Sequence, residues 1–305
     1  MPQARTPLDE VVITGNYGAA VSALLPTHVR TLGIAGFPAL PAPVYIALRE
    51  RFPQATVNDA SSLLLALRQI KSPAEIALLR EASRITDAGG RAFLEWARSG
   101  VSERELLVRV EAAMKRSGSD EVSFSTQICS GLRTAQVVAF AGDVELAEGM
   151  PVQLDCGATC QGYRGDLSRM IFLGKPSGRL LDLMVAAAEI YDRCVELLRP
   201  GVSCAEVARL AVKIAEGRGL GRNLYRSPNH ELGFVGHGIG CSYSEPPELH
   251  PANETVLCEN MVIVLEPIVS DPSVGGVKLE DPVLITAAGP QRLSSLPVRS
   301  GEWPQ

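Results

Sequence analysis

Four acidic residues and one histidine lie on or beside apolar, strand-like stretches of this chain: Asp155, Asp166, His237, Glu266 and Glu280. Like charges opposite each other on neighbouring strands destabilise a sheet by roughly 0.2–1 kcal/mol, and burial increases the penalty. Divalent cations between the carboxylates would remove that penalty. The residue types and their placement therefore predict a site for two metal ions.

The spacing of the acids supports this prediction. Asp155 and Asp166 flank one predicted turn, and the two strands on either side would bring them face to face. Glu266 and Glu280 flank a second turn in the same way. Each acid pair is therefore expected to face across a hairpin, and the two pairs to meet around the metal.

His237 lies in the glycine-rich segment GHGIG, residues 236–240. Glycines there let the backbone come close to a site. Carboxylates suit hard cations such as Mn²⁺ or Mg²⁺, and one imidazole shifts the preference toward Mn, Fe, Co or Zn. We expect two divalent ions, with Mn²⁺ favoured and Fe, Co or Zn as alternatives.

Two α/β domains are predicted to position these residues. Residues 1–71 alternate short strands and helices, as a small α/β unit does. A long helix then opens with Ser72 as its cap, Pro73 at its first position and Glu75 completing a capping box. This signature places the domain boundary at residue 71, with the metal-binding domain at residues 72–305.

The larger domain contains an internal repeat. The sequence GVS at residues 100–102 recurs at residues 201–203, and MPVQLD at residues 150–155 is echoed by MVIVLE at residues 261–266. Each half reads helix, helix, then strands, with an acid at the end of its first strand. The repeat indicates a pseudo-twofold with the carboxylates between the halves; chance matching of short segments is the alternative.

Composition excludes several classes of protein. The net charge of −5 and the absence of a dense Lys/Arg run argue against nucleic-acid binding. No apolar stretch has membrane-spanning length, and the first residues lack the apolar core of a signal peptide. The 7 scattered cysteines argue against a disulfide framework. We expect a soluble cytoplasmic protein.

The segments that carry the five residues resemble those of the pita-bread (M24) metallopeptidases, over roughly residues 72–290. They are LDCGATCQGYRGDLSRMIFLGKPS, GHGIGCSYSEPPEL, VIVLEPIV and GVKLEDPVLIT. The opening helix, KSPAEIALLREASRITDAG, is similar to the aminopeptidase P, prolidase and creatinase branch. The resemblance implies an α/β (α+β) pita-bread catalytic domain with an internal pseudo-twofold. Residues 1–71 look like the second half of a creatinase-like N-terminal domain.

The resemblance also implies roles for the site residues. All five fall on family metal ligands, with Asp166 and Glu280 bridging two ions and Glu266 moving protons. A bridging hydroxide would then cleave a C–N bond in a small, dipeptide-like substrate. The family further implies a homodimer.

Three positions depart from the family pattern. Val138, Gly233 and Ser244 stand where the family usually has histidines that hydrogen-bond the substrate and the tetrahedral intermediate. One such donor is worth roughly 2.7–4 kcal/mol, so their loss is expected to weaken amide hydrolysis. Polarisation of the substrate by the metal is expected to remain intact.

Other residues are candidates for the substrate pocket. His230, shortly before the GHGIG segment, is the possible catalytic replacement for the missing histidines, with a histidine in a surface loop as the alternative. Tyr243 and Arg169 lie near the ligands in sequence and could contact substrate, as could Ser244 and Val138. For Arg169 the alternative is structural support through a pair with an acid.

Three functions remain open from the sequence. The first is a dinuclear hydrolase resembling Xaa-Pro dipeptidase or aminopeptidase P. The second is a non-peptidase enzyme of the same fold, a lyase or a specialised amidase, which the missing histidines favour. The third is a non-catalytic metal-binding protein, against which the complete ligand set argues.

Overall fold

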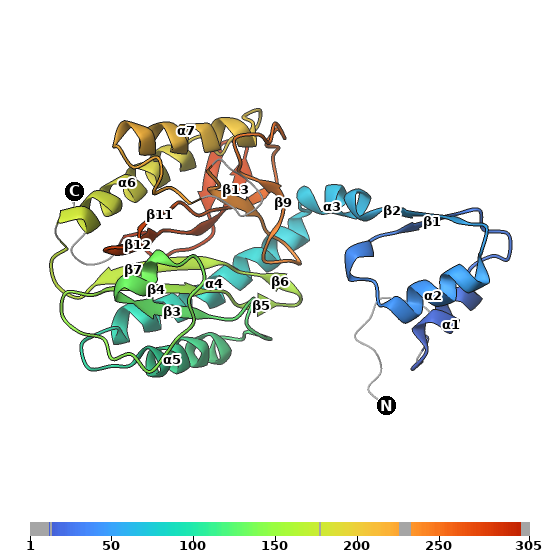
Figure 1. Cartoon of the computed structure of the whole chain (residues 1–305), viewed down its shortest axis with the longest axis horizontal. Coiled ribbons are helices and arrows are strands. Elements are labelled where there is room, and N and C mark those ends of the chain that lie inside the picture. The colour runs from blue at the N-terminus through green and yellow to red at the C-terminus, as the bar shows by residue number, and fades with distance from the viewer. Residues whose placement is uncertain (1–11, 13, 177, 226–232, 300–305) are drawn as a thin grey trace. The chain divides into compact units, whose positions relative to one another are not determined.

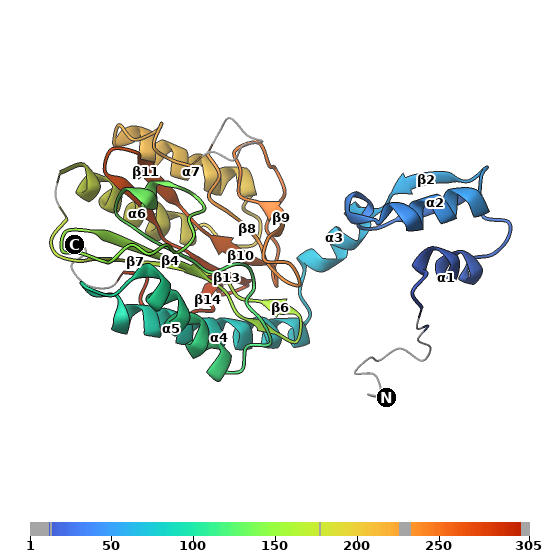
Figure 2. The same ribbon diagram turned by 60° about the horizontal axis from the view of Figure 1, so that its bottom comes forward.

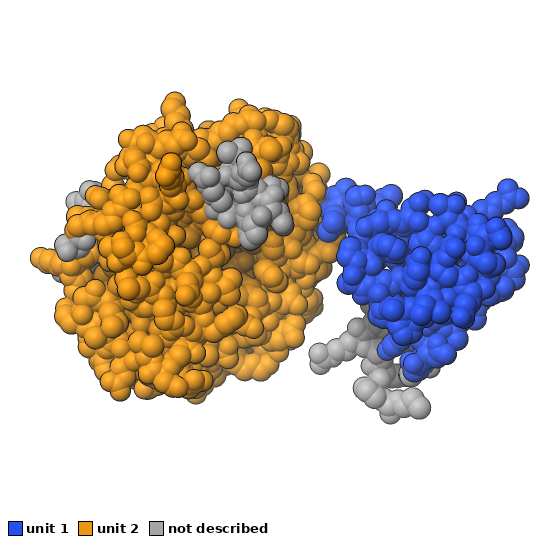
Figure 3. Space-filling view, viewed as in Figure 1, with its two compact units in different colours: residues 1–67 blue, residues 68–305 orange. Residues whose placement is uncertain are grey.

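The computed structural model describes residues 12, 14–176, 178–225 and 233–299. It divides the chain into two compact units, residues 1–67 and 68–305 (Figure 3).

Unit 1 is a small α/β unit around a parallel strand pair, in which Thr31 pairs with Thr56. Its core contains Leu32, Leu48 and Phe52. Its elements are α1 (Tyr17–Leu24), β1 (Thr31–Ile34), η1 (Phe37–Ala39), α2 (Ala42–Arg51), β2 (Thr56–Asp59) and α3 (Ser61–Gln69). The last two residues of α3 belong to unit 2.

The first half of unit 2 packs two helices against a three-stranded antiparallel sheet of order β3-β4-β7. The predicted capping box is confirmed, because the Ser72 hydroxyl accepts from the Glu75 amide and the Glu75 carboxylate accepts from the Ser72 amide. The elements are α4 (Pro73–Trp96), α5 (Glu103–Arg116), β3 (Gln127–Ser130), η2 (Gly131–Ala135), β4 (Pro151–Cys156), β5 (Thr159–Cys160), β6 (Tyr163–Arg164) and β7 (Leu167–Phe172).

The second half repeats the order of helix, helix and strands. Its second helix also begins with a capping box, between Ser203 and Glu206. Its main sheet is antiparallel with order β14-β13-β10-β8-β9, and β11 and β12 form a separate hairpin. The elements are α6 (Gly178–Val195), α7 (Cys204–Gly217), β8 (Gly236–Gly238), β9 (Glu245–Glu248), β10 (Val262–Leu265), β11 (Ile268–Asp271), β12 (Gly275–Lys278), β13 (Asp281–Thr286) and β14 (Gly289–Arg292).

The strands of unit 2 lie between the two helix pairs. In Figures 1 and 2, α6 and α7 lie along one side of the strands and α4 and α5 along the other. Each helix pair covers its own apolar cluster, one including Leu183, Val207 and Ile263 and the other including Leu106 and Leu154. No helix in the described part of the chain is long and apolar enough to cross a bilayer.

Candidate metal centre

The five predicted ligands converge from both halves of unit 2. From the first half, Asp155 is the second-last residue of β4, and Asp166 immediately precedes β7. From the second half, His237 is the central residue of β8, Glu266 follows β10, and Glu280 lies between β12 and β13. All are buried, with at most 7% of any residue exposed. A β-bridge between Ser168 and Glu280 joins the two halves next to the cluster.

The register of the strands agrees with one expected acid pair and differs for the other. Ile268 pairs with Lys278 at the end of the β11–β12 hairpin. Two residues beyond this pair, the same register places Glu266 opposite Glu280, as expected. Asp155 instead pairs with Ser168, two residues beyond Asp166. The expectation that the two aspartates face each other directly is therefore wrong, because the hairpin turns at Gln161 and Gly162, where Cys160 pairs with Tyr163, and the same register continued along the strands places Asp155 opposite Ser168.

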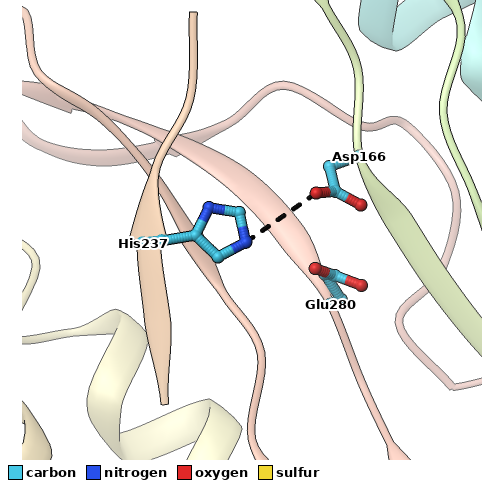
Figure 4. Close-up of side chains that lie close together, drawn as sticks. All are labelled: Asp166, His237 and Glu280. Atoms are coloured by element: carbon cyan, nitrogen blue, oxygen red, sulfur yellow. Dashed lines mark ion pairs between the residues drawn. The ribbon is translucent and has the colours of Figure 1, made fainter. Parts of the chain in front are cut away.

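Three of the ligands are close enough to hold one ion together. Asp166, His237 and Glu280 each offer one ligand atom, and these atoms all lie within 4.8 Å of one another. Figure 4 shows the imidazole directed at the two carboxylates. The His237 Nε2 atom lies 3.8 Å from Asp166 Oδ2 and 3.3 Å from Glu266 Oε1.

Neighbouring groups orient the imidazole of His237. Its Nδ1 lies 2.9 Å from the carbonyl oxygen of Gly238, which favours the tautomer with the proton on Nδ1. The Nε2 lone pair then faces the carboxylates, as metal ligation requires. The ring of Phe234 also stacks on the imidazole, at 6.3 Å between centroids.

A lysine lies among the acids, and sequence reasoning missed it. The Lys278 Nζ atom is 2.8 Å from Asp155 Oδ2, 3.1 Å from Glu266 Oε2 and 3.2 Å from Glu280 Oε2. The available signal was alternation: Lys278 is two residues before Glu280 in an apolar strand, so both side chains share a face. A charged residue on that face needed a partner.

Burial makes three of the acids resist ionisation. It raises the pKa of Asp155 although Lys278 acts in the opposite direction. Burial and the charge of Glu280 raise the pKa of Asp166 well above its usual range. Burial also raises the pKa of Glu280, to about 8. Added positive charge would be needed to keep all of these groups ionised.

Glu266 behaves differently. Burial acts to raise its pKa, but Lys278 and His237 outweigh burial and lower the pKa to about 2. Burial acts to lower the pKa of Lys278, and the surrounding carboxylates reverse this and raise it well above its usual range. In the protein without metal, Glu266 and Lys278 therefore form an ionised pair at neutral pH.

The donor set fits a divalent cation. Carboxylate oxygens and one imidazole nitrogen are ligands for Mn²⁺, Fe²⁺, Co²⁺ and Zn²⁺. In addition, Asp155 Oδ1 is buried and has no hydrogen-bond partner among the described residues. A buried carboxylate oxygen without a donor is expected where a cation belongs.

The cluster lies at a cavity of about 430 Å³. Tyr243 lines the cavity and its ring packs, tilted, against that of Phe124 at 5.4 Å between ring centroids. Val138 and Ser244, named as substrate candidates, line it too. The remaining wall is mostly aromatic and apolar and includes Val137, Phe140, Tyr225 and Phe234.

Gly233 and His230 were the two remaining positions of interest for the pocket. A Cβ atom at Gly233 would lie 2.8 Å from Leu224 Cδ2 and 3.0 Å from Val212 Cγ2, so a histidine there would require these side chains to move. Apolar packing thus fills the space that a larger residue would use. His230 lies outside the described residues.

Arg169 supports the framework and does not line the cavity. It is fully buried, and its guanidinium donates to Asp281 Oδ1 and to the carbonyl of Glu280, both at 2.7 Å. The Tyr191 hydroxyl donates to the other oxygen of Asp281 at 2.6 Å. The structural alternative for Arg169 therefore replaces the expected substrate contact, since this geometry holds the backbone that carries Glu280.

The close approach of β8 and β9 next to His237 gives a testable prediction. A Cβ atom at Gly238 would lie 2.6 Å from the carbonyl oxygen of Pro246 and 2.8 Å from that of Glu245. Because these are backbone atoms, Gly238→Ala should displace a strand and lower the free energy of unfolding by about 1–3 kcal/mol, measured by urea denaturation. Gly217→Ala, where nothing lies within 4 Å, is the control and should change little. Equal stability of the two variants would contradict the prediction.

Comparison with known proteins agrees with this fold. The model of metallopeptidase family M24 matches residues 77–287. The chain is 33% identical over 266 residues to the Xaa-Pro dipeptidase of Pyrococcus horikoshii, covering 87% of this chain and 73% of that protein. Among solved structures it is similar to the Pyrococcus horikoshii prolidase, with TM-score 0.86, 31% identity, and coverage of 95% of this chain and 80% of that chain. It is also similar to the Xaa-Pro dipeptidase from Bacillus anthracis, with TM-score 0.81, 32% identity, and coverage of 88% and 73%.

The chain therefore belongs to metallopeptidase family M24, and it is a metal-dependent hydrolase of that family. Unit 2 has the family's pita-bread fold, and the N-terminal part of the chain is consistent with these relatives. Within the family the similarity is to Xaa-Pro dipeptidases and prolidases, which confirms the resemblance, the fold class and the prediction of an enzyme.

Proposed function

We propose that this chain cleaves a C–N bond in a small, dipeptide-like substrate, in the manner of an Xaa-Pro dipeptidase. The observation that carries the proposal is the buried triplet Asp166, His237 and Glu280, with ligand atoms within 4.8 Å of one another, beside a cavity of about 430 Å³. A cavity of this size suits a small ligand. The relatives named as Xaa-Pro dipeptidases support the choice of substrate class.

The five buried ligands would hold the metal: Asp155, Asp166, His237, Glu266 and Glu280. Mn²⁺ is the first candidate, and Fe, Co or Zn are the alternatives. When bound, divalent metal lowers the pKa of a water molecule and polarises a substrate carbonyl.

Glu266 is the proposed proton carrier. Its carboxylate is ionised in the metal-free protein, so it has the free acceptor oxygen that proton transfer from the attacking water requires. It would then deliver the proton to the leaving nitrogen. Its place beside His237 and facing the cavity supports this role.

The cavity wall supports a second candidate, a specialised amidase or a lyase of the same fold. Val138 and Ser244 line the cavity where the family has histidines, and His237 is the one histidine among the described lining residues. Fewer donors for a tetrahedral intermediate would slow peptide hydrolysis. A mostly apolar wall would then favour a substrate with apolar groups.

Proline release from Xaa-Pro dipeptides distinguishes the two candidates. Protein loaded with Mn²⁺ should release proline from dipeptides with apolar first residues, and chelation of the metal should stop the release. If protein with confirmed bound metal releases none, the dipeptidase proposal is rejected in favour of the second candidate.

Glu266→Gln is expected to lower kcat by about 10²–10⁴-fold, because an amide of the same shape cannot accept the proton. The kinetics are compared at saturating Mn²⁺ with those of Glu259→Gln, an exposed acid that serves as control. Wild-type turnover in Glu266→Gln would refute the assigned role.

The proposed oligomeric state and cellular location of the protein rest on its resemblance to the family. We propose a homodimer in the cytoplasm with a small-molecule or dipeptide-like substrate as its partner, and neither nucleic acid nor membrane. The net charge of −5 supports the exclusion of nucleic acid.

A further inference from the structure

Glu103 is a fully buried acid outside the metal centre. It is the first residue of α5, and its side chain is 0% exposed. Its Oε1 accepts a hydrogen bond from the Ser130 hydroxyl at 2.7 Å. Its Oε2 accepts from the Arg133 guanidinium at 2.5 Å and from the Gly142 amide at 2.8 Å. A buried carboxylate needs such partners, so three donors of the first half are directed at this one group.

The internal repeat shows that the helix start itself does not need an acid at this position. The corresponding first residue of α7 is Cys204, which is also buried. Glu103 and Cys204 each donate their backbone amide to a carbonyl of a later loop, that of Val144 and that of Thr255, at 2.9 Å in both cases. The same helix start and loop contact therefore form in the second half without a carboxylate.

The carboxylate of Glu103 holds the segment that follows η2, residues 137–142, which we call the wall segment. Gly142 of this segment donates its amide directly to Glu103. Arg133, which also binds Glu103, donates to the carbonyl oxygen of Phe140. Two main-chain groups of the wall segment are thus held by Glu103, one directly and one through Arg133.

The wall segment presents apolar side chains at the cavity beside the metal centre. Val138 and Phe140 line the cavity and are 56% and 55% exposed. Ala139, between them, is buried, and its amide donates to Gln127 Oε1 at 3.1 Å. Large apolar side chains that are exposed together at a cavity mark a surface that a ligand covers.

We propose that Glu103 is a positioning residue for substrate binding, which holds the wall segment so that Val138 and Phe140 contact an apolar group of the substrate. The proposal rests on the proposed function in placing the substrate in this cavity. It deepens that function by assigning an aliphatic or aromatic group of the substrate to this wall. Glu103 itself does not line the cavity, so it acts through the wall segment.

Binding of two hydroxamates to the protein loaded with Mn²⁺ tests the proposal without requiring turnover. Acetohydroxamate and hexanohydroxamate bind metal through the same group, but only the second has a chain long enough to reach the wall. Wild type should bind hexanohydroxamate about tenfold more tightly, because burial of part of an alkyl chain is favourable. Glu103→Ala should lose most of this preference, as measured by titration calorimetry. Equal affinities in wild type, or binding of neither compound, would overturn the proposal.

A double-mutant cycle distinguishes positioning from a general effect on the fold. Phe140→Ala should lose the same preference, because it removes part of the wall itself. The double variant Glu103→Ala/Phe140→Ala should lose no more than either single variant, since both changes act on one contact. Additive losses would contradict the proposal.

A conservative variant should restore binding. The amide oxygen of Glu103→Gln can still accept from the Gly142 amide, so this variant should retain most of the preference for hexanohydroxamate. Equal losses in Glu103→Gln and Glu103→Ala would refute the assigned contact. If Glu103→Ala does not fold, Arg133→Met replaces it in the cycle, because its side chain is 35% exposed and it breaks the contact with the Phe140 carbonyl.

Val207→Ala is the control for lost stability, because Val207 is buried in the apolar cluster of the second half, away from the cavity. It should lower the free energy of unfolding and keep the preference. With the dipeptide Leu-Pro as substrate, Glu103→Ala should raise KM and leave kcat nearly unchanged, since the metal ligands are untouched. A lower kcat with unchanged KM would count against positioning. Failure of wild type to release proline would reject the proposed substrate class alone, because the hydroxamate cycle does not depend on it.

Discussion

The Asp166→Asn variant is expected to bind no stoichiometric metal and to lose its metal-dependent activity. Asp166 belongs to the triplet whose ligand atoms lie within 4.8 Å of one another, and an amide supplies no negative charge to a cation. Groups that only support a metal ligand typically change metal affinity by about 10–100-fold when mutated, so loss of a ligand should exceed that range. Titration of the metal-free protein with Mn²⁺ measures the affinity directly.

Stability should change in the opposite direction to activity. Asp166 is buried beside Glu280, and both resist ionisation, so a neutral amide removes an unfavourable charge from the metal-free protein. Metal-free Asp166→Asn should be at least as stable as metal-free wild type. Wild type should gain about 2.7 kcal/mol at a metal concentration of 100 times Kd, and the variant should gain nothing.

Asp271→Asn is a control for the charge change, because Asp271 is the last residue of β11, lies outside the centre and pairs with Arg179. It should keep metal and activity. Unchanged Mn²⁺ affinity in Asp166→Asn would exclude Asp166 as a ligand.

Arg169→Met is expected to destabilise the protein by about 3–5 kcal/mol, because it leaves the buried carboxylate of Asp281 without its main partner. Both members of this ion pair have fully buried side chains, with 0% exposed. The variant also removes the hydrogen bond that the Arg169 guanidinium donates to the backbone carbonyl of Glu280. Metal affinity should therefore fall as well, although Arg169 does not touch the cavity. Urea denaturation of the metal-free protein isolates the effect on folding.

An exposed ion pair provides the matched control. Arg209 pairs with Glu254, and their side chains are 55% and 65% exposed. Arg209→Met should lower stability by less than about 1 kcal/mol, since solvent screens such pairs. The double variant Arg169→Met/Asp281→Asn should recover part of the loss, because it removes a buried charge that only Arg292, at 3.3 Å, would still pair. Similar losses in Arg169→Met and Arg209→Met would show that burial of the pair contributes nothing.

Local patterns in the sequence determined the secondary structure around the site. The capping boxes at Ser72 and Ser203 and the repeated order of helix, helix and strands are found in the structure. These features depend on residues a few positions apart, so neighbouring side chains carry the information. The acid at the end of each repeated strand was identified for the same reason, because a charge in an apolar strand needs a compensating partner.

The pairing between strands was less accessible from the sequence. The offset of Asp155 from Asp166 is set by the exact position of the turn, at Gln161 and Gly162, and an offset of two residues keeps both side chains on the same face of the sheet. Gly233 likewise looked like a missing histidine, whereas its surroundings are closed by Leu224 and Val212. Periodicity alone could not distinguish these arrangements.

The sequence by itself determined that four carboxylates and an imidazole lie on apolar strands, and from them it predicted a metal-dependent enzyme. Only the tertiary structure decided which basic side chains contact the buried carboxylates. Lys278 reaches Asp155 from a position 123 residues away, and Arg169 reaches Asp281 from 112 residues away. Such contacts depend on how the two halves pack and on the register of their strands, since alternation specifies a face of the sheet but not the groups that meet there.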